Sequence, residues 1–256
     1  MIRLGLVGCG NLARQAHVAS VARIPDAAFV AYADVVEDAA RGFLAEFGGE
    51  FATPDPQRIF DDPTIDAVYL CTRHDSHAPL AIAAAKAGKH VLIEKPLSLT
   101  EEGCEAIARA VDDAGTILMP AFKMRYTPLV RQAREFVPEP FVLVGQMMDN
   151  RWADGFWAQD PVQGGANVHS QGCHTTDILR YLERVAAEHR LAVRSAEPQA
   201  AQQVTIDLAC VDAVERQPQA AIAAAVGVAD AQPDGAAVEC RLGELPAQVA
   251  ERAHRP

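Results

Sequence analysis

Short apolar runs alternate with helix-like amphipathic stretches along the first 120 residues of the chain. The apolar runs, each long enough for one strand, are residues 2–7, 28–33, 67–71, 91–93 and 116–119. Runs that are apolar throughout are typical of strands buried on both faces of a parallel sheet. Helical patterns separate them, among them residues 37–47, 79–87 and a helix that Thr100 caps. This alternation predicts an α/β fold, a doubly wound parallel sheet of the Rossmann type, over residues 1–120.

The first apolar run leads into Gly8-Cys9-Gly10-Asn11-Leu12-Ala13, a G-x-G-x-x-A sequence that opens a helix running to about Ser20. The first glycine permits a tight turn, and the second lets the backbone approach a pyrophosphate. Ala13 allows helix and strand to pack closely, and the helix N-terminus attracts phosphates. Other tight turns into a helix carry the same sequence, so the motif alone is weak. We predict dinucleotide contacts from Gly8, Gly10, Asn11, Leu12 and Ala13.

Asp34 follows directly after the second apolar run. An acid at this position binds both ribose hydroxyls of the adenosine half of NAD and repels the 2′-phosphate of NADP. Val35 and Val36 come next, so neither arginine nor serine is there to hold that phosphate. The alternative role for Asp34 is a helix N-cap. We predict that Asp34 binds the cofactor and selects NAD over NADP.

The run at 91–93 ends abruptly in Glu94-Lys95-Pro96. Proline cannot continue a sheet ladder, and it restricts the conformation of the residue before it. Lys95 is therefore predicted at the carboxyl end of a strand, where open α/β sheets bind their ligands. A lysine there can donate or accept a proton, because burial readily shifts its pKa. The alternative is a surface Glu-Lys pair in a strand-to-helix loop.

The stretch Gly88-Lys89-His90-Val91-Leu92-Ile93 followed by Glu94-Lys95-Pro96 resembles the Gfo/Idh/MocA oxidoreductases, the glucose–fructose oxidoreductase and inositol dehydrogenase family. The resemblance extends from residue 1 to about residue 182. It implies that Lys95 is catalytic beside the nicotinamide, with Glu94 at the cofactor site, and that the Lys-Pro peptide bond is often cis.

The resemblance also implies cofactor contacts at the end of the 67–71 run, where the family usually has Thr-Pro-Asn. Arg73 and His74 replace the Pro and Asn here, which leaves their contacts open. For His74 and His77 the alternative is hydrogen bonding within the loop and helix cap. The implied contact residues are Thr72, Arg73, His74 and His77.

Residues 164–182 resemble the family's second signature, a helix that carries Gly-x-His-x-x-Asp. His174 matches the position of the family's proton-transferring His or Tyr, and Asp177 can orient its ring. Ser170 precedes His174 by one helical turn, where many relatives carry Asp. The resemblance implies a catalytic His174 supported by Ser170 and Asp177; the alternative is a structural histidine.

Residues 121–183 predict the start of an α+β second domain, with a helix at about 128–136 and a strand at 141–148. An aromatic loop follows, from Asn150 to Trp157. Its tryptophans either stack on a sugar ring or pack between domains. The candidate substrate contacts are Lys123, Arg125, Arg151 and Trp152. The basic residues that would favour an anionic substrate such as a sugar acid are Arg73, Lys123, Arg125 and Arg151.

The chain beyond Tyr181 holds no aromatic residue and is rich in alanine. Nothing after Glu183 shows a composition typical of strands, although the family adds antiparallel strands here that commonly form its homo-oligomer interface. We therefore predict an incomplete second domain and a tail of uncertain fold over residues 184–256. Either the reading frame is broken near residue 183 or the tail is a divergent replacement; the alternative is a helical extension around 219–229.

Composition excludes several classes of protein. A formal charge of −11 argues against nucleic acid and anionic membrane surfaces as partners. No apolar run approaches the roughly 20 residues that span a bilayer. The six cysteines are scattered without a C-x-x-C pair, which favours reduced thiols in the cytoplasm. Cys173, His174 and His169 match no standard metal spacing, so we predict no metal.

These observations together predict an NAD-dependent oxidoreductase. The hydride passes between the nicotinamide and a secondary alcohol of a small-molecule sugar, cyclitol or sugar acid, while Lys95 and His174 share the acid–base work. Two alternatives stay open. One is a non-catalytic dinucleotide-binding regulator, and the other is an NAD-dependent glycoside hydrolase that returns the hydride to its substrate.

Overall fold

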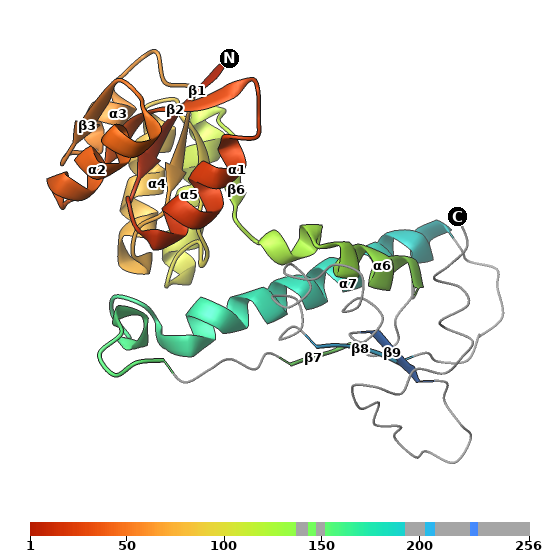
Figure 1. Cartoon of the computed structure of the whole chain (residues 1–256). Helices are drawn as coiled ribbons and strands as arrows, with labels where there is room; N and C mark the ends of the chain where they lie inside the picture. The colour runs from red at the N-terminus through yellow and green to blue at the C-terminus, as the bar shows by residue number, and fades with distance from the viewer. Residues whose placement is uncertain (137–142, 147–151, 193–202, 208–225, 230–256) are drawn as a thin grey trace. The chain divides into compact units, whose positions relative to one another are not determined.

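The computed structural model describes residues 1–136, 143–146, 152–192, 203–207 and 226–229, and Figure 1 labels most of their α-helices and strands. The chain divides into two compact units. The first unit contains residues Met1–Ala121 and Ala153–Ser170, and the second contains Phe122–Trp152 and Gln171–Pro256.

The first unit is built on a six-stranded parallel sheet with the strand order β3-β2-β1-β4-β5-β6. This order reverses direction at β1, which lies between β2 and β4, as in doubly wound dinucleotide-binding sheets. The six strands are β1 (Ile2–Val7), β2 (Ala27–Ala33), β3 (Phe51–Thr53), β4 (Ala67–Leu70), β5 (His90–Ile93) and β6 (Leu118–Pro120). The predicted doubly wound fold is therefore confirmed.

Helices connect the strands of this sheet. After β1 a π-helical stretch, η1 (Ala13–Val18), continues into α1 (Ala19–Val21). The remaining helices of residues 1–121, which we call the nucleotide half, are α2 (Glu37–Phe47), α3 (Gln57–Phe60), η2 (His74–Ser76), α4 (His77–Lys86) and α5 (Glu101–Ala114). Thr100 caps α5 as predicted, because its Oγ1 accepts a hydrogen bond from the Gly103 amide at 3.1 Å.

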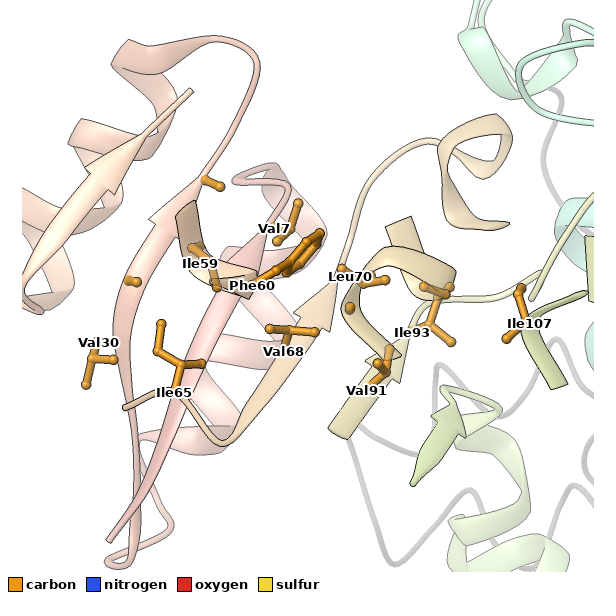
Figure 2. Packing of buried hydrophobic residues seen from close by; sticks show 14 residues of the cluster. Val7, Val30, Ile59, Phe60, Ile65, Val68, Leu70, Val91, Ile93 and Ile107 are labelled. Atoms are coloured by element: carbon orange, nitrogen blue, oxygen red, sulfur yellow. The ribbon is translucent and has the colours of Figure 1, made fainter. Parts of the chain in front are cut away.

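Both faces of the sheet are covered by apolar side chains. Along β1, successive side chains point to opposite faces, so Leu6 and Val7 belong to different clusters. The cluster drawn in Figure 2 joins the sheet to α3, α4 and α5 through residues such as Ile59, Phe60 and Ile107. The other cluster joins the sheet to η1, α1 and α2. This double cover explains why most positions of the strands are apolar.

A separate segment of the first unit, residues 153–170, returns after the chain has passed through part of the second unit. It contains the short helix η4 (Trp157–Gln159) and the beginning of η5 (Val168–Gly172). The predicted division placed these residues wholly in the second domain. They belong with the nucleotide half because Trp157, Gln163 and Gly164 contact the residues that follow β4.

The second unit packs η3 (Lys123–Tyr126), α6 (Pro128–Phe136) and α7 (Cys173–Ala192) around an apolar cluster. That cluster consists of Met124, Leu129, Val130, Ala133, Ile178 and Leu182. Strand β7 (Val144–Gln146) packs against α7, since a Cβ atom on Gly145 would lie 3.2 Å from Leu179. The predicted helix at 128–136 is confirmed, and the ends of the predicted strand at 141–148 lie outside the described residues.

The expectation that no strand follows Glu183 is wrong. The structure has β8 (Gln203–Asp207) parallel to β7, and β9 (Val226–Ala229) antiparallel to β8. Both strands contain β-branched residues, Val204, Thr205 and Ile206 in β8 and Val226 and Val228 in β9, and such residues support a strand without aromatic side chains. The alternative helix at 219–229 is also contradicted at its end by β9, whereas residues 219–225 lie outside the described part of the chain.

Candidate functional site

The glycine loop after β1 has the geometry that a phosphate-binding turn needs. Gly8 has φ +95°, and a Cβ on it would lie 2.6 Å from the backbone of Cys71, so only glycine fits there. In contrast, a Cβ on Gly10 would meet no atom within 4 Å. Ala13 is fully buried against the sheet. The loop is therefore held closely by β4 on one side and leaves backbone accessible at Gly10, which fits a pyrophosphate.

Asp34 lies directly after β2 and is hydrogen-bonded to this loop. Its Oδ2 accepts a hydrogen bond from the Cys9 amide at 2.8 Å, and its Oδ1 accepts one from the Val36 amide at 2.9 Å. Asp34 thus presents a carboxylate beside the glycine turn, where a dinucleotide-binding sheet holds its adenosine ribose. The same carboxylate and burial raise the pKa of the Cys9 thiol to about 12, with burial the larger cause.

The turn after β5 presents Lys95 at the same carboxyl edge of the sheet. The Lys95–Pro96 peptide bond is cis. The Glu94 amide still donates to Leu70 O at 2.9 Å, so the strand pairing continues up to the turn. Lys95 Nζ donates a hydrogen bond to the carbonyl oxygen of Ser170 at 2.8 Å. The ammonium group is therefore fixed over the end of the sheet by the returning segment 153–170.

Glu94 is a buried carboxylate with partners on two sides. Its Oε1 lies 2.8 Å from His17 Nε2, and its Oε2 accepts a hydrogen bond from the Lys95 amide at 3.2 Å. Burial acts to raise the pKa of Glu94, but the hydrogen bond and charge of His17 and the proximity of Lys95 outweigh it. The pKa of Glu94 is consequently lowered.

The two residues after Thr72 have partners in the returning segment. An Arg73 guanidinium nitrogen donates to Gln163 Oε1 at 2.6 Å. His74 is buried with Nδ1 2.8 Å from Gly164 O and its ring edge-on to Trp157 at 4.7 Å. Burial lowers the pKa of His74 to about 4, so the ring is neutral at pH 7. These side chains hold segment 153–170 in place, and their predicted cofactor contacts remain a prediction.

His77 connects the ends of β4 and β5. Its side chain is fully buried, with Nδ1 2.7 Å from Pro96 O and Nε2 3.2 Å from Thr72 O. Burial lowers the pKa of His77 in spite of these two carbonyl oxygens. A neutral ring donates from one nitrogen, and we assign the proton to Nδ1 because that contact is the shorter. Thr72 in turn accepts a hydrogen bond at Oγ1 from Ser76 Oγ at 2.7 Å.

The second unit holds the other predicted catalytic group. His174 is buried, with the ring of Phe122 edge-on at 6.1 Å. Asp177 is hydrogen-bonded through both oxygens to Arg125, with Nε to Oδ2 at 2.6 Å, and its expected role in orienting His174 remains a prediction. The pKa of Arg125 is raised chiefly by this hydrogen bond. The charge of Arg125 is thus paired with a buried carboxylate, so Arg125 is less suited to bind an anionic substrate.

Of the other three predicted substrate residues, the structure describes two. Lys123 is exposed on η3, Trp152 is half-buried, and Arg151 lies outside the described residues. Within the part of the chain that the structure describes, no group of three His, Cys, Asp or Glu side chains is arranged to hold a metal ion. No described helix is both long enough and apolar enough to cross a bilayer.

His17 is the functional candidate that sequence reasoning missed. It lies on the helix after the glycine loop, one turn beyond the fully buried Ala13. Residues four apart share a helix face, so a polar side chain at position 17 had to point toward the sheet. That spacing was the available signal. The partner, Glu94, lies 77 residues further along the chain and could not be paired with it by spacing.

A glycine loop, an acid after β2 and a lysine at the end of β5, all at the carboxyl edge of one sheet, define a dinucleotide-binding α/β unit. Residues 2–122 match the family model described as "Oxidoreductase family, NAD-binding Rossmann fold". The chain belongs, over these residues, to the Gfo/Idh/MocA oxidoreductases.

Named relatives agree with this membership. The levoglucosan dehydrogenase of Pseudarthrobacter phenanthrenivorans is 33% identical over 201 residues, which are 71% of this chain and 51% of that protein. The myo-inositol 2-dehydrogenase of Thermotoga maritima is 35% identical over 136 residues, 53% of this chain and 40% of that protein.

Among solved structures, levoglucosan dehydrogenase in complex with NADH and levoglucosan matches with a TM-score of 0.63 and 31% identity. The match covers 71% of this chain and 54% of that one. The chain thus spans about half the length of the curated relatives it matches.

Proposed function

We propose that this chain is an NAD-dependent dehydrogenase acting on a secondary alcohol of a sugar, cyclitol or related polyol. The observation that carries the proposal is Lys95, held by Ser170 O at the carboxyl edge of the sheet that also bears the glycine loop. The named relatives, which are dehydrogenases of levoglucosan and inositols, support the substrate class.

The residues of the first unit suit the two halves of such a reaction. Gly8, Gly10 and Asp34 would hold the dinucleotide, which would supply the hydride acceptor for the carbinol carbon. The hydroxyl proton must leave at the same time, and the Lys95 amine is the group we assign to take it. In the reverse direction the Lys95 ammonium returns the proton. His174, which belongs to the second unit, remains our proposed second proton carrier.

Asp34 supports a preference for NAD. Its carboxylate is fixed next to the glycine loop by the Cys9 and Val36 amides, and the neighbouring Val35 and Val36 are exposed. A 2′-phosphate at this place would face a negative charge without a compensating arginine in the same turn. Arg14, on the adjacent helix, is paired with Glu46 and packed over the Phe43 ring at 4.6 Å.

We favour a neutral polyol over a sugar acid. Of the basic residues proposed to favour an anion, Arg73 donates to Gln163 and Arg125 is paired with Asp177. We also propose the cytoplasm as the compartment. The four cysteines of the described residues are free thiols, which suits a reducing environment.

The test is a fluorescence titration of the purified chain with NADH and NADPH, followed by a screen of polyols for NADH formation. We expect saturable binding that prefers NADH, and turnover with at least one polyol. Lys95→Ala should lower kcat by about 10²–10⁴-fold and leave NADH affinity within about twofold. Lys86→Ala, at the end of α4, is the matched control and should keep full activity.

Two outcomes would contradict the proposal and favour the alternatives. NADH binding without turnover on any polyol would favour a dinucleotide-binding regulator. Release of free sugar from a glycoside, with no net NADH, would favour a glycoside hydrolase. Full activity in Lys95→Ala would remove Lys95 from the mechanism.

A further inference from the structure

His17 reaches from the glycine-loop helix to the residue next to Lys95. Its Nε2 atom lies 2.8 Å from Glu94 Oε1, and both side chains are 12% exposed. The imidazole is also fixed by the Tyr69 ring, which lies edge-on at 5.5 Å. The pair thus joins η1, which begins three residues after Gly10, to the turn that follows β5.

Glu94 links His17 to the backbone of Lys95. One carboxylate oxygen faces His17, and the other accepts the hydrogen bond of the Lys95 amide at 3.2 Å. Lys95 Nζ is held independently by Ser170 O at 2.8 Å. The backbone of Lys95 is therefore anchored through Glu94, while its side chain is anchored through segment 153–170.

We propose that His17 is a positioning residue that keeps Glu94 ionised and bonded to the Lys95 amide, and so couples the dinucleotide-binding helix to the catalytic lysine. This inference rests on the proposed function for its role in catalysis. The link between His17, Glu94 and the Lys95 amide is a property of the folded chain, and it can be observed without turnover.

The electrostatic surroundings explain why His17 matters. Burial alone favours protonated Glu94, and the lowered pKa of Glu94 depends on His17 more than on any other residue. The remaining titratable groups that face Glu94 are Lys95, Cys71, His74 and His77. Cys71, His74 and His77 are disfavoured as charged groups by burial, so they supply little compensating charge.

Removing the His17 side chain should therefore raise the pKa of Glu94. In His17→Leu no hydrogen bond or charge at Oε1 opposes the effect of burial. Glu94 should then take up a proton at a pH above 4.5, the ordinary pKa of a glutamate. A protonated Glu94 is a weaker acceptor for the Lys95 amide. In His17→Gln, the amide nitrogen can occupy the place of Nε2 and donate to Oε1, so the change should be smaller.

The experiment follows the Lys95 amide directly by NMR on the full chain labelled with ¹⁵N-lysine. Few signals are expected, because the lysines of the sequence are Lys86, Lys89, Lys95 and Lys123. The Lys95 signal is assigned by its absence in Lys95→Ala. Its shift is recorded from pH 8 downward in the unsubstituted chain, His17→Leu, His17→Gln and the control His90→Leu. His90 lies at the opposite end of β5 from Glu94.

We expect the Lys95 amide to titrate below pH 4.5 in the unsubstituted chain and in His90→Leu. The midpoint should rise by about one unit or more in His17→Leu, with His17→Gln in between. The acid limb of the kcat profile should move with the same midpoint, and KM should change little.

An unmoved NMR midpoint in His17→Leu, or an equal shift in His90→Leu, would overturn the inference. A moved NMR midpoint with an unmoved acid limb would also overturn it, because His17 would then be merely structural. If the unsubstituted chain turns over no polyol while the midpoint still moves, the proposed function fails and the coupling of His17 to the Lys95 turn stands.

Glu94→Gln gives the same test from the other partner, in case His17→Leu does not fold. It should abolish the acid-side titration of the Lys95 amide and remove the acid limb of kcat. A Lys95 signal that still titrates in Glu94→Gln would contradict the proposed coupling.

Discussion

The Nδ1 atom of His77 lies 2.7 Å from the carbonyl oxygen of Pro96, so the first residue of α4 holds the turn that presents Lys95. The other ring nitrogen lies 3.2 Å from Thr72 O. Since the neutral ring donates from Nδ1 alone, the clamp is the buried hydrogen bond from Nδ1 to Pro96 O. It fixes the start of α4, which follows β4, against the turn that follows β5.

Replacing this histidine tests the clamp. His77→Phe keeps most of the volume but leaves the Pro96 carbonyl buried without a donor, which costs about 1–3 kcal/mol in the free energy of unfolding. His77→Asn, whose amide nitrogen can stand in for Nδ1, should lose less. Urea unfolding of both variants measures the difference. Equal destabilisation by Phe and Asn would show that the Nδ1 hydrogen bond is not what the position requires.

Asp34 should decide the cofactor preference. Asp34→Asn keeps an oxygen for the Cys9 amide and removes the negative charge that faces a 2′-phosphate. We expect the ratio of the NADPH and NADH dissociation constants to fall by about tenfold, which is about 1.4 kcal/mol. Asp38→Asn, in the first turn of α2, is the control. An unchanged ratio in Asp34→Asn would place the selection elsewhere.

His74 should make stability depend on pH. Its folded pKa is about 4, below the ordinary 6.5, because burial disfavours the charged ring. The unfolded chain therefore binds more protons between these values, and stability falls as the pH drops from 6.5 to 4. One proton contributes at most about 1.4 kcal/mol per pH unit.

In His74→Asn the amide can still donate to Gly164 O but does not titrate, so this part of the pH dependence should disappear. Denaturant unfolding at several pH values measures it. His169→Asn is the matched control, since His169 also contacts a carbonyl oxygen, that of Gly165, but is exposed. A slope that persists in His74→Asn would assign the dependence to another group.

The pair formed by Arg125 and Asp177 should stabilise the second unit. The Asp177 side chain is only 6% exposed, so Arg125→Met leaves a buried carboxylate without its guanidinium partner. We expect a loss of about 3–5 kcal/mol in the free energy of unfolding. Replacing both residues, with Asp177→Leu added, should recover much of it. A double-mutant cycle measures the coupling, and simple additivity of the two changes would argue against a direct pair.

Gly164 should be intolerant of any side chain. A Cβ on it would collide with the backbone of Ala158, which cannot move aside as a flexible side chain can. Gly164→Ala should therefore displace the segment that contacts Arg73 and His74, and destabilise the chain by several kcal/mol, about 2–4. Gly42→Ala, on α2 with nothing within 4 Å, should be neutral or stabilising by about 1 kcal/mol. Thermal unfolding compares the two, and equal effects would contradict the collision.

The nucleotide half was predictable because each of its features is written in a short stretch of sequence. Apolar runs determine the strands, two glycines and Ala13 determine the first turn, and a proline ends β5 beside Lys95. The doubly wound parallel sheet follows once strands and helices alternate, whereas the order of the strands in it was not predicted. Local patterns also located Thr100 as a cap, because capping involves residues only three apart.

Partners that are distant in sequence were not predictable by the same reasoning. His74 meets Gly164, 90 residues later, His17 meets Glu94, 77 residues later, and Arg125 meets Asp177, 52 residues later. Spacing carries no information over such lengths. The strands β8 and β9 were missed for a different reason. Aromatic content was given more weight than the alternation of β-branched residues, of which Val226 and Val228 are an example.

The nucleotide-binding unit is made of two pieces of chain, Met1–Ala121 and Ala153–Ser170, although the family model ends at residue 122. A fragment cut at residue 121 would keep every strand of the sheet. It would lose Gln163, Gly164 and the Ser170 carbonyl that anchors Lys95. In a chimaera that uses this unit, the chain therefore should not be cut at residue 121 or 122. Residues 153–170 have to be included together with residues 1–121, as a covalently linked insert.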